Sequence, residues 1–83
     1  MNFYIYLLIC KDNSLYCGST RDLNQREAEH NSGKGSKYVR SRGGGKIVYH
    51  ETFRSLSKAL KREAAIKKLS RLEKLKLIKP RGK

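Results

Sequence analysis

Two apolar segments near the N-terminus, separated by a turn, decide the fold. Residues 3–10 read FYIYLLIC and residues 15–19 read LYCGS. Both segments are rich in β-branched and aromatic residues, which favour strands. The intervening KDNS of residues 11–14 supplies residue types that are common in turns. The two segments therefore predict a β-hairpin over residues 3–19, and the first strand, apolar on both faces, is expected to be central.

The rest of the chain carries alternating helix and strand signals. Asp22 is a good N-cap for a first helix, Ser55 or Ser57 for a second, and Ser70 with Glu73 matches a capping box for a third. The predicted elements are a helix over 23–31, a basic glycine-rich loop over 32–45 with room for one helical turn at 36–40, a strand over 46–53, and helices over 55–69 and 70–78. The order β-β-α-β-α-α indicates an α+β fold, a small three-stranded antiparallel sheet flanked by helices.

Length and charge restrict the class of protein. The 83 residues allow a single domain, 1–83, with a core over about 3–78 and a basic, frayed tail at 79–83. Twenty Lys and Arg against seven Asp and Glu give a net charge of +13, so the expected partner is nucleic acid. A membrane is disfavoured because the basic residues do not gather on one amphipathic face. The acidic residues are too scattered for a cage of several carboxylates.

The two cysteines and the apolar N-terminal run bear on location. Cys10 and Cys17 could pair across the hairpin, but the simpler interpretation is two small apolar strand residues in a reducing cytosol. Two Cys and two distant His lack the spacing of a zinc site. The run over residues 3–10 is too short to cross a bilayer. We therefore expect a cytoplasmic protein, and a monomer.

One carboxylate falls among the apolar residues of the predicted helix over 55–69. Glu63 lies near the centre of a stripe formed by Leu56, Ala59, Leu60, Ala64 and Ile66. A buried carboxylate is costly unless it is paired or binds a metal. Two interpretations stay open: a functional carboxylate, or an i,i+4 ion pair with Lys67.

Other polar residues also fall where a core is expected. Arg26 and His30 are one helical turn apart and could jointly contact a phosphate, or else belong to a solvated helix held by Leu23 and Ala28. Tyr4 and Tyr6 share one face of the first strand, and Tyr16 and Gly18 share one face of the second, so one tyrosine from each strand can lie side by side. Two phenols near an Arg, a His and a lone carboxylate could transfer protons at a phosphodiester, although strand tyrosines are common without any function.

Together these residues resemble a known family. Tyr4-Ile5-Tyr6 followed by Tyr16-Cys17-Gly18 is similar to the paired motif of the GIY-YIG nuclease superfamily. Residues 20–30 resemble the first helix of that family and residues 61–69 its C-terminal helix. The resemblance extends over about residues 3–78 and is closest to the small stand-alone bacterial endonucleases of the URI type.

The resemblance implies an endonuclease that hydrolyses phosphodiester bonds in DNA with one divalent cation, magnesium or alternatively manganese. It implies a role for each candidate residue. Glu63 would bind the metal, Tyr6 would activate the attacking water, Tyr16 would orient the water or the phosphate, Arg26 would neutralise charge on the phosphate, and His30 would contact the phosphate or position the tyrosines.

Three positions depart from the family pattern. Tyr4 stands where the family has Gly, and Cys17 replaces the usual aliphatic residue or Thr. Glu27 stands where a large apolar residue is usual, which leaves the packing of that helix open.

Alternatives to a nuclease remain at this point. A non-catalytic nucleic-acid-binding module on the same fold, or a basic RNA-binding protein, would carry the same charge. In each case the backbone contacts are expected from the basic residues over 58–68 and from the loop residues Lys34, Lys37, Arg40 and Arg42. A nuclease could act on branched, nicked or damaged DNA, as in repair or recombination, and be recruited by a partner protein.

Overall fold

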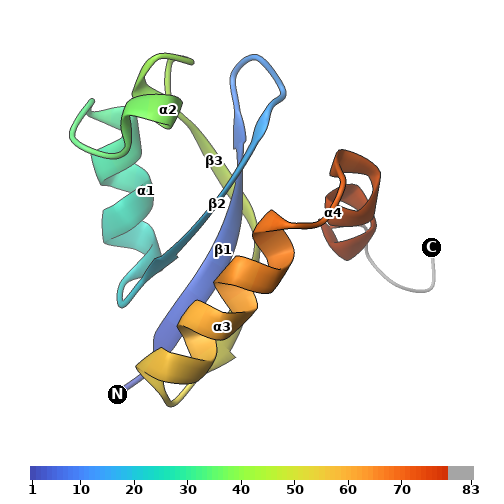
Figure 1. Cartoon of the computed structure of the whole chain (residues 1–83). Helices are drawn as coiled ribbons and strands as arrows, with labels where there is room; N and C mark the ends of the chain where they lie inside the picture. The colour runs from blue at the N-terminus through green and yellow to red at the C-terminus, as the bar shows by residue number, and fades with distance from the viewer. Residues whose placement is uncertain (79–83) are drawn as a thin grey trace.

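The computed structural model describes residues 1–78, which form a three-stranded antiparallel sheet with helices on both faces (Figure 1). The strand order is β2-β1-β3, so the predicted central position of the first strand is confirmed. The predicted α+β fold is also confirmed, and the turn expected at 36–40 is a short helix. The expected tail at 79–83 lies outside the described residues. The elements are β1 (Phe3–Cys10), β2 (Leu15–Thr20), α1 (Leu23–Asn31), α2 (Lys37–Arg40), β3 (Gly45–Phe53), α3 (Leu56–Lys67) and α4 (Arg71–Ile78).

The two faces of the sheet carry different cores. On one face Ile5, Leu7 and Cys17 pack against Ala59 and Ile66 of α3. On the other face lie Tyr6, Leu8, Cys10, Tyr16, Leu23, Val39 and Ile47, which come from the sheet, α1 and α2. Figure 1 shows α1 and α2 on one side of the strands, with α3 on the other. The side chains of β1 thus alternate between two cores, as its continuous apolar sequence predicts.

Both cysteines are free and buried, on opposite faces of the sheet. The interpretation as small apolar residues is confirmed. Burial raises the pKa of the Cys17 thiol to about 11, so this thiol is protonated and unreactive at neutral pH.

An irregularity in the sheet explains the unusual Glu27. The pairing of β1 with β3 shifts between Leu7 and Leu8, which lie opposite Tyr49 and Ile47. At this bulge the backbone N–H of Ile47 donates to the Glu27 carboxylate at 2.6 Å. The Glu27 carboxylate therefore accepts a hydrogen bond from a backbone N–H that the bulge leaves unpaired in the sheet, and this bond attaches α1 to β3.

Helix α3 does not bury the stripe that its sequence predicts. Ala59 and Ile66 are fully buried, but Leu56 and Leu60 are 50% and 46% exposed. On the sheet side of the helix Arg62 donates to both carboxylate oxygens of Glu51 at 2.8 and 2.9 Å. A bidentate ion pair thus occupies part of the helix face that the sequence predicts to be apolar. Among the described residues no helix is long and apolar enough to cross a membrane.

Candidate active site

The hairpin places two phenols side by side over a glycine. Tyr6 lies opposite Gly18 in the β1–β2 register, and the rings of Tyr6 and Tyr16 are 6.3 Å apart. A Cβ at Gly18 would lie 2.6 Å from the Tyr6 hydroxyl oxygen and 3.0 Å from the Tyr16 ring. Only glycine leaves room for this arrangement, because the Tyr6 ring itself approaches the backbone of Gly18 closely.

Helix α1 delivers a histidine to the same two rings. The helix begins at the Asp22 cap, whose side chain accepts the Gln25 N–H at 3.0 Å, and His30 follows in its last turn. His30 is 1% exposed, and its Nε2 lies 2.8 Å from the Tyr6 hydroxyl oxygen. Its ring packs edge-on against Tyr6 and Tyr16 at 5.9 and 5.5 Å. The alternative of a solvated α1 is therefore wrong for this face of the helix.

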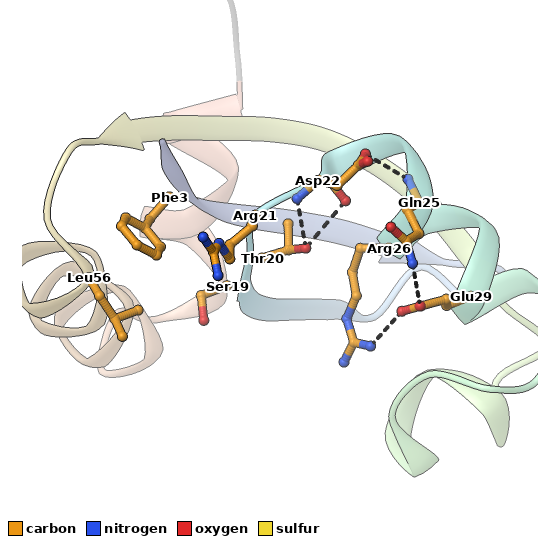
Figure 2. Close-up of a pocket in the computed structure, with 9 residues that line it drawn as sticks. All are labelled: Phe3, Ser19, Thr20, Arg21, Asp22, Gln25, Arg26, Glu29 and Leu56. Atoms are coloured by element: carbon orange, nitrogen blue, oxygen red, sulfur yellow. Dashed lines mark hydrogen bonds and ion pairs between the residues drawn. The ribbon is translucent and has the colours of Figure 1, made fainter. Parts of the chain in front are cut away.

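Arg26 lies one turn before His30 and is half-buried. Its Nη1 donates to the Glu29 carboxylate at 2.9 Å, as Figure 2 shows, while its Nε is buried without a partner in the described part of the chain. The guanidinium adjoins the Tyr6 hydroxyl closely enough to influence its protonation. Arg26 thus has donor capacity left for an anion next to Tyr6.

The charge states of Tyr6 and His30 follow from burial. Burial raises the pKa of Tyr6 to about 12, although the adjacent Arg26 guanidinium acts in the opposite direction. Burial also lowers the pKa of His30, and the positive charge of Arg26 lowers it further. At neutral pH the phenol is therefore protonated and the imidazole is neutral. Because Arg26 is a donor beside the same oxygen, the phenol can give its own proton to Nε2.

Glu63 lies in the other layer, on α3. Its side chain is 15% exposed, and one carboxylate oxygen lies 3.0 Å from Lys67 Nζ. The i,i+4 ion pair considered from the sequence is thus present. Burial is the main cause of the raised pKa of Tyr6, and the negative charge of Glu63 is the smallest of the contributions that raise it. The structure brings Tyr6, Tyr16, Arg26 and His30 together. In the described part of the chain Glu63 makes no hydrogen bond or ion pair with any of these four and lies on the opposite face of the sheet.

The carboxylate of Glu63 suits a magnesium ion. Within residues 1–78 no three His, Cys, Asp or Glu side chains gather as a ligand set. Magnesium keeps several waters and commonly uses one or two carboxylates with substrate phosphate oxygens. The hard carboxylate of Glu63 fits that pattern by its chemistry, and Lys67 Nζ is its present partner at 3.0 Å.

A cleft of about 420 Å³ begins at Arg26. Figure 2 shows it extending from Arg26 and Glu29 of α1, past Thr20 at the end of β2, to Phe3 and Leu56. This cleft was not predictable from the sequence, because its walls come from β1, β2, α1 and α3.

The basic loop residues differ in their surroundings. Lys34, Lys37 and Arg40 are exposed beside the end of α1. Arg42 is instead half-buried, with Nε 3.3 Å from the Asp12 carboxylate and its guanidinium 3.8 Å from the centre of the Tyr38 ring. Three of the four predicted nucleic-acid contacts therefore lie free on the surface, and the fourth is already engaged.

Comparison with known proteins agrees with this fold and site. Residues 2–76 match the family model described as the GIY-YIG catalytic domain. The chain therefore belongs to the GIY-YIG family, as its paired tyrosine motif indicates.

Among its relatives are small bacterial proteins. The UPF0213 protein SH2523 of Staphylococcus haemolyticus is 50% identical over 94% of this chain and 95% of its own length. A UPF0213 protein of Syntrophus aciditrophicus is 56% identical over 92% and 88%. The solution NMR structure of the UPF0213 protein BH0048 from Bacillus halodurans superimposes with a TM-score of 0.60 at 45% identity, covering 94% of this chain and 83% of that one. Similar structures thus exist for the whole described fold.

Proposed function

We propose that the protein is a metal-dependent endonuclease that hydrolyses phosphodiester bonds in DNA. The observation that supports this most is the arrangement around the Tyr6 phenol. The Tyr16 ring, the buried neutral His30 and Arg26, which has a free donor, all lie next to it. Membership of a family defined by a catalytic domain supports the same reading. The net charge of +13 suits a polyanionic substrate.

The residues divide the work of one hydrolytic step. A water attacks the phosphorus and gives its proton to the Tyr6 oxygen while Tyr6 passes its own proton to His30 Nε2. The relay avoids a free phenolate, which the raised pKa of Tyr6 disfavours. The P–O bond to the leaving oxygen breaks, and that oxygen takes a proton from solvent.

The other residues hold the phosphate. Arg26 donates to its oxygens and offsets the charge that develops in the transition state. Tyr16 orients the water or the phosphate from the neighbouring strand. A magnesium ion held by Glu63, with manganese as the alternative, would supply charge stabilisation at the phosphate when bound.

The experiment that tests this function compares nicking of supercoiled plasmid and cleavage of branched DNA by the wild type and Glu63→Ala, with and without magnesium. Glu63→Gln is the matched variant, because it keeps size and hydrogen bonding and removes the charge. We expect both variants to lose at least a hundredfold in rate while remaining folded by circular dichroism. Equal rates in all three proteins would show that the cleavage comes from a contaminant.

A second candidate is a binding module without catalysis. The Lys67–Glu63 ion pair favours it, since a lysine occupies the carboxylate that a metal would need. Titrating the free protein with magnesium and following backbone chemical shifts separates the two functions. Shifts around Glu63 at millimolar metal support the endonuclease, and none there supports the binding module.

A further inference from the structure

The exposed side of Tyr16 is covered by a residue that the sequence did not single out. The rings of Tyr16 and Tyr38 lie 5.7 Å apart and 30° from parallel. Tyr16 belongs to the edge strand β2, so its ring has Tyr6 and His30 as neighbours on the core side. Tyr38 closes the side that would otherwise be open to solvent.

Helix α2 is fixed firmly enough to hold Tyr38 in place. Val39, the next residue, is fully buried in the core beside Tyr6 and Leu8. The Ser36 side chain caps the helix and accepts the Val39 N–H at 3.3 Å. Tyr38 is therefore anchored by its backbone, although its side chain is 39% exposed.

Arg42 connects this helix to the hairpin turn. Its guanidinium lies 3.8 Å from the centre of the Tyr38 ring, and Nη1 donates to the Tyr38 carbonyl at 3.2 Å. Nε lies 3.3 Å from the carboxylate of Asp12, in the turn between β1 and β2. A stack therefore runs from Asp12 through Arg42 and Tyr38 to Tyr16, joining two loops that are distant in sequence.

We propose that Tyr38 and Arg42 are positioning residues for the Tyr16 phenol, and that Arg42 acts through Tyr38 and not as a ligand of the nucleic-acid backbone. This inference rests on the proposed endonuclease function. An edge-strand tyrosine without Tyr38 would gain side-chain freedom, and a misplaced catalytic group can slow a reaction about a hundredfold. Under this proposal the phosphate contacts from the loop are made by Lys34, Lys37 and Arg40, and Arg42 makes none.

The first test separates ring stacking from other roles of Tyr38. We expect Tyr38→Ala to lower kcat at least about tenfold with KM changed less than about twofold, because the phenol is displaced and the basic surface is intact. Tyr38→Phe keeps the ring and should retain kcat within about twofold. Equal kcat for the wild type and Tyr38→Ala would overturn the proposal.

The second test asks whether Arg42 contacts phosphate. Each phosphate contact contributes close to one unit to the slope of log K against log salt. Arg42→Gln should leave this slope unchanged and lower kcat, whereas the matched variant Arg40→Gln should reduce the slope by about one. A reduced slope with normal kcat in Arg42→Gln would show that Arg42 is a phosphate ligand.

A third measurement does not depend on cleavage. The aromatic NMR signals of Tyr16 should shift and broaden in Tyr38→Ala and in Arg42→Gln, and stay close to wild type in Tyr38→Phe. Unchanged Tyr16 signals in Tyr38→Ala would remove the positioning role whether or not the protein is a nuclease. If the wild type does not cleave DNA but the Tyr16 signals respond as expected, the proposed function fails and the structural role of the stack stands. Dispersed amide spectra check the fold, and Tyr38→Leu replaces Tyr38→Ala if that variant unfolds.

Discussion

The hydroxyl of Tyr6 lies 2.8 Å from Nε2 of His30, which joins the middle of the central strand to the last turn of α1. Both side chains are essentially inaccessible to solvent, at 0% and 1% exposed. Each therefore provides a hydrogen-bond partner for a buried polar atom of the other. The same contact that orders the core supplies a path for a proton, so stability and catalysis are expected to change together when it is altered.

Removing the Tyr6 hydroxyl should affect both properties. Tyr6→Phe keeps the ring and leaves Nε2 of His30 buried without a partner, so we expect a loss of about 1–3 kcal/mol in the free energy of unfolding. Cleavage should be abolished, because the proton relay is broken. Urea unfolding and a cleavage assay measure the two effects. The control is Tyr4→Phe on the same strand, which should change stability by less than about 0.5 kcal/mol; equal losses in the two variants would contradict the role of the Tyr6–His30 bond.

Adding one methyl group at Gly18 should displace the Tyr6 phenol. The new Cβ would lie 2.6 Å from the hydroxyl oxygen and 2.8 Å from Cζ, closer than side chains tolerate. The ring is confined by the sheet and by His30, so Gly18→Ala should lower the unfolding free energy by about 1–3 kcal/mol. Cleavage should fall about a hundredfold or more, because the phenol moves away from the water. A Gly18→Ala protein with normal cleavage and normal stability would show that the ring has more room than its contacts indicate.

Stability should decrease below neutral pH through His30. Burial, with help from Arg26, lowers the pKa of the folded-state imidazole below its ordinary value of 6.5. Between these two pKa values the unfolded chain binds a proton that the folded protein does not, so stability is full above about pH 6.5 and is lost as the pH falls below it. Urea midpoints at about pH 7.5 and about pH 5.5 should therefore differ in the wild type. The carboxylates of Glu29 and Glu51, whose pKa values are lowered by Arg26 and Arg62, stay ionised in this range.

Two variants test whether His30 is the cause of this pH dependence. His30→Gln should remove most of the difference between the two midpoints, at a lower overall stability. His50→Gln, at an exposed histidine of β3, should retain the difference. The same difference in all three proteins would mean that another group titrates in this window.

The contact between Glu27 and the bulge in β3 should stabilise the fold. Glu27→Ala leaves the N–H of Ile47 without its carboxylate partner, and we expect a loss of about 1–3 kcal/mol in unfolding free energy despite the better helix propensity of alanine. Glu27→Gln keeps an acceptor oxygen and should lose less. The control Asn24→Ala, at an exposed position of α1, should be neutral or slightly stabilising. A Glu27→Ala protein as stable as Asn24→Ala would show that water replaces the carboxylate without penalty.

The predictable part of the site depends on short-range rules. Hairpin pairing predicts that one of Tyr4 and Tyr6 lies beside Tyr16, because residues on adjacent strands share a face at fixed spacing. The register of the structure sets Tyr6 opposite Gly18 and next to Tyr16. Helical periodicity places Arg26 and His30 one turn apart on the same face of α1. These rules also predicted the elements themselves, since apolar patterns and caps act within a few residues.

Contacts between elements could not be predicted in the same way. The ion pair of Arg62 with Glu51 joins α3 to β3. The ion pair of Arg42 with Asp12 joins the loop after α2 to the turn between β1 and β2. Neither contact has a sequence spacing that could reveal it.

The amino-acid order alone was sufficient for the hairpin, the helix starts, the family motif and the five candidate site residues, because each depends on local pattern. Packing of the helices on the sheet decided which of those side chains touch. It buried His30 against Tyr6 and set Arg42 against Asp12 of the hairpin turn. The physical reason is that side-chain contacts between distant segments follow from how the layers fill space, and such packing has no period in the chain.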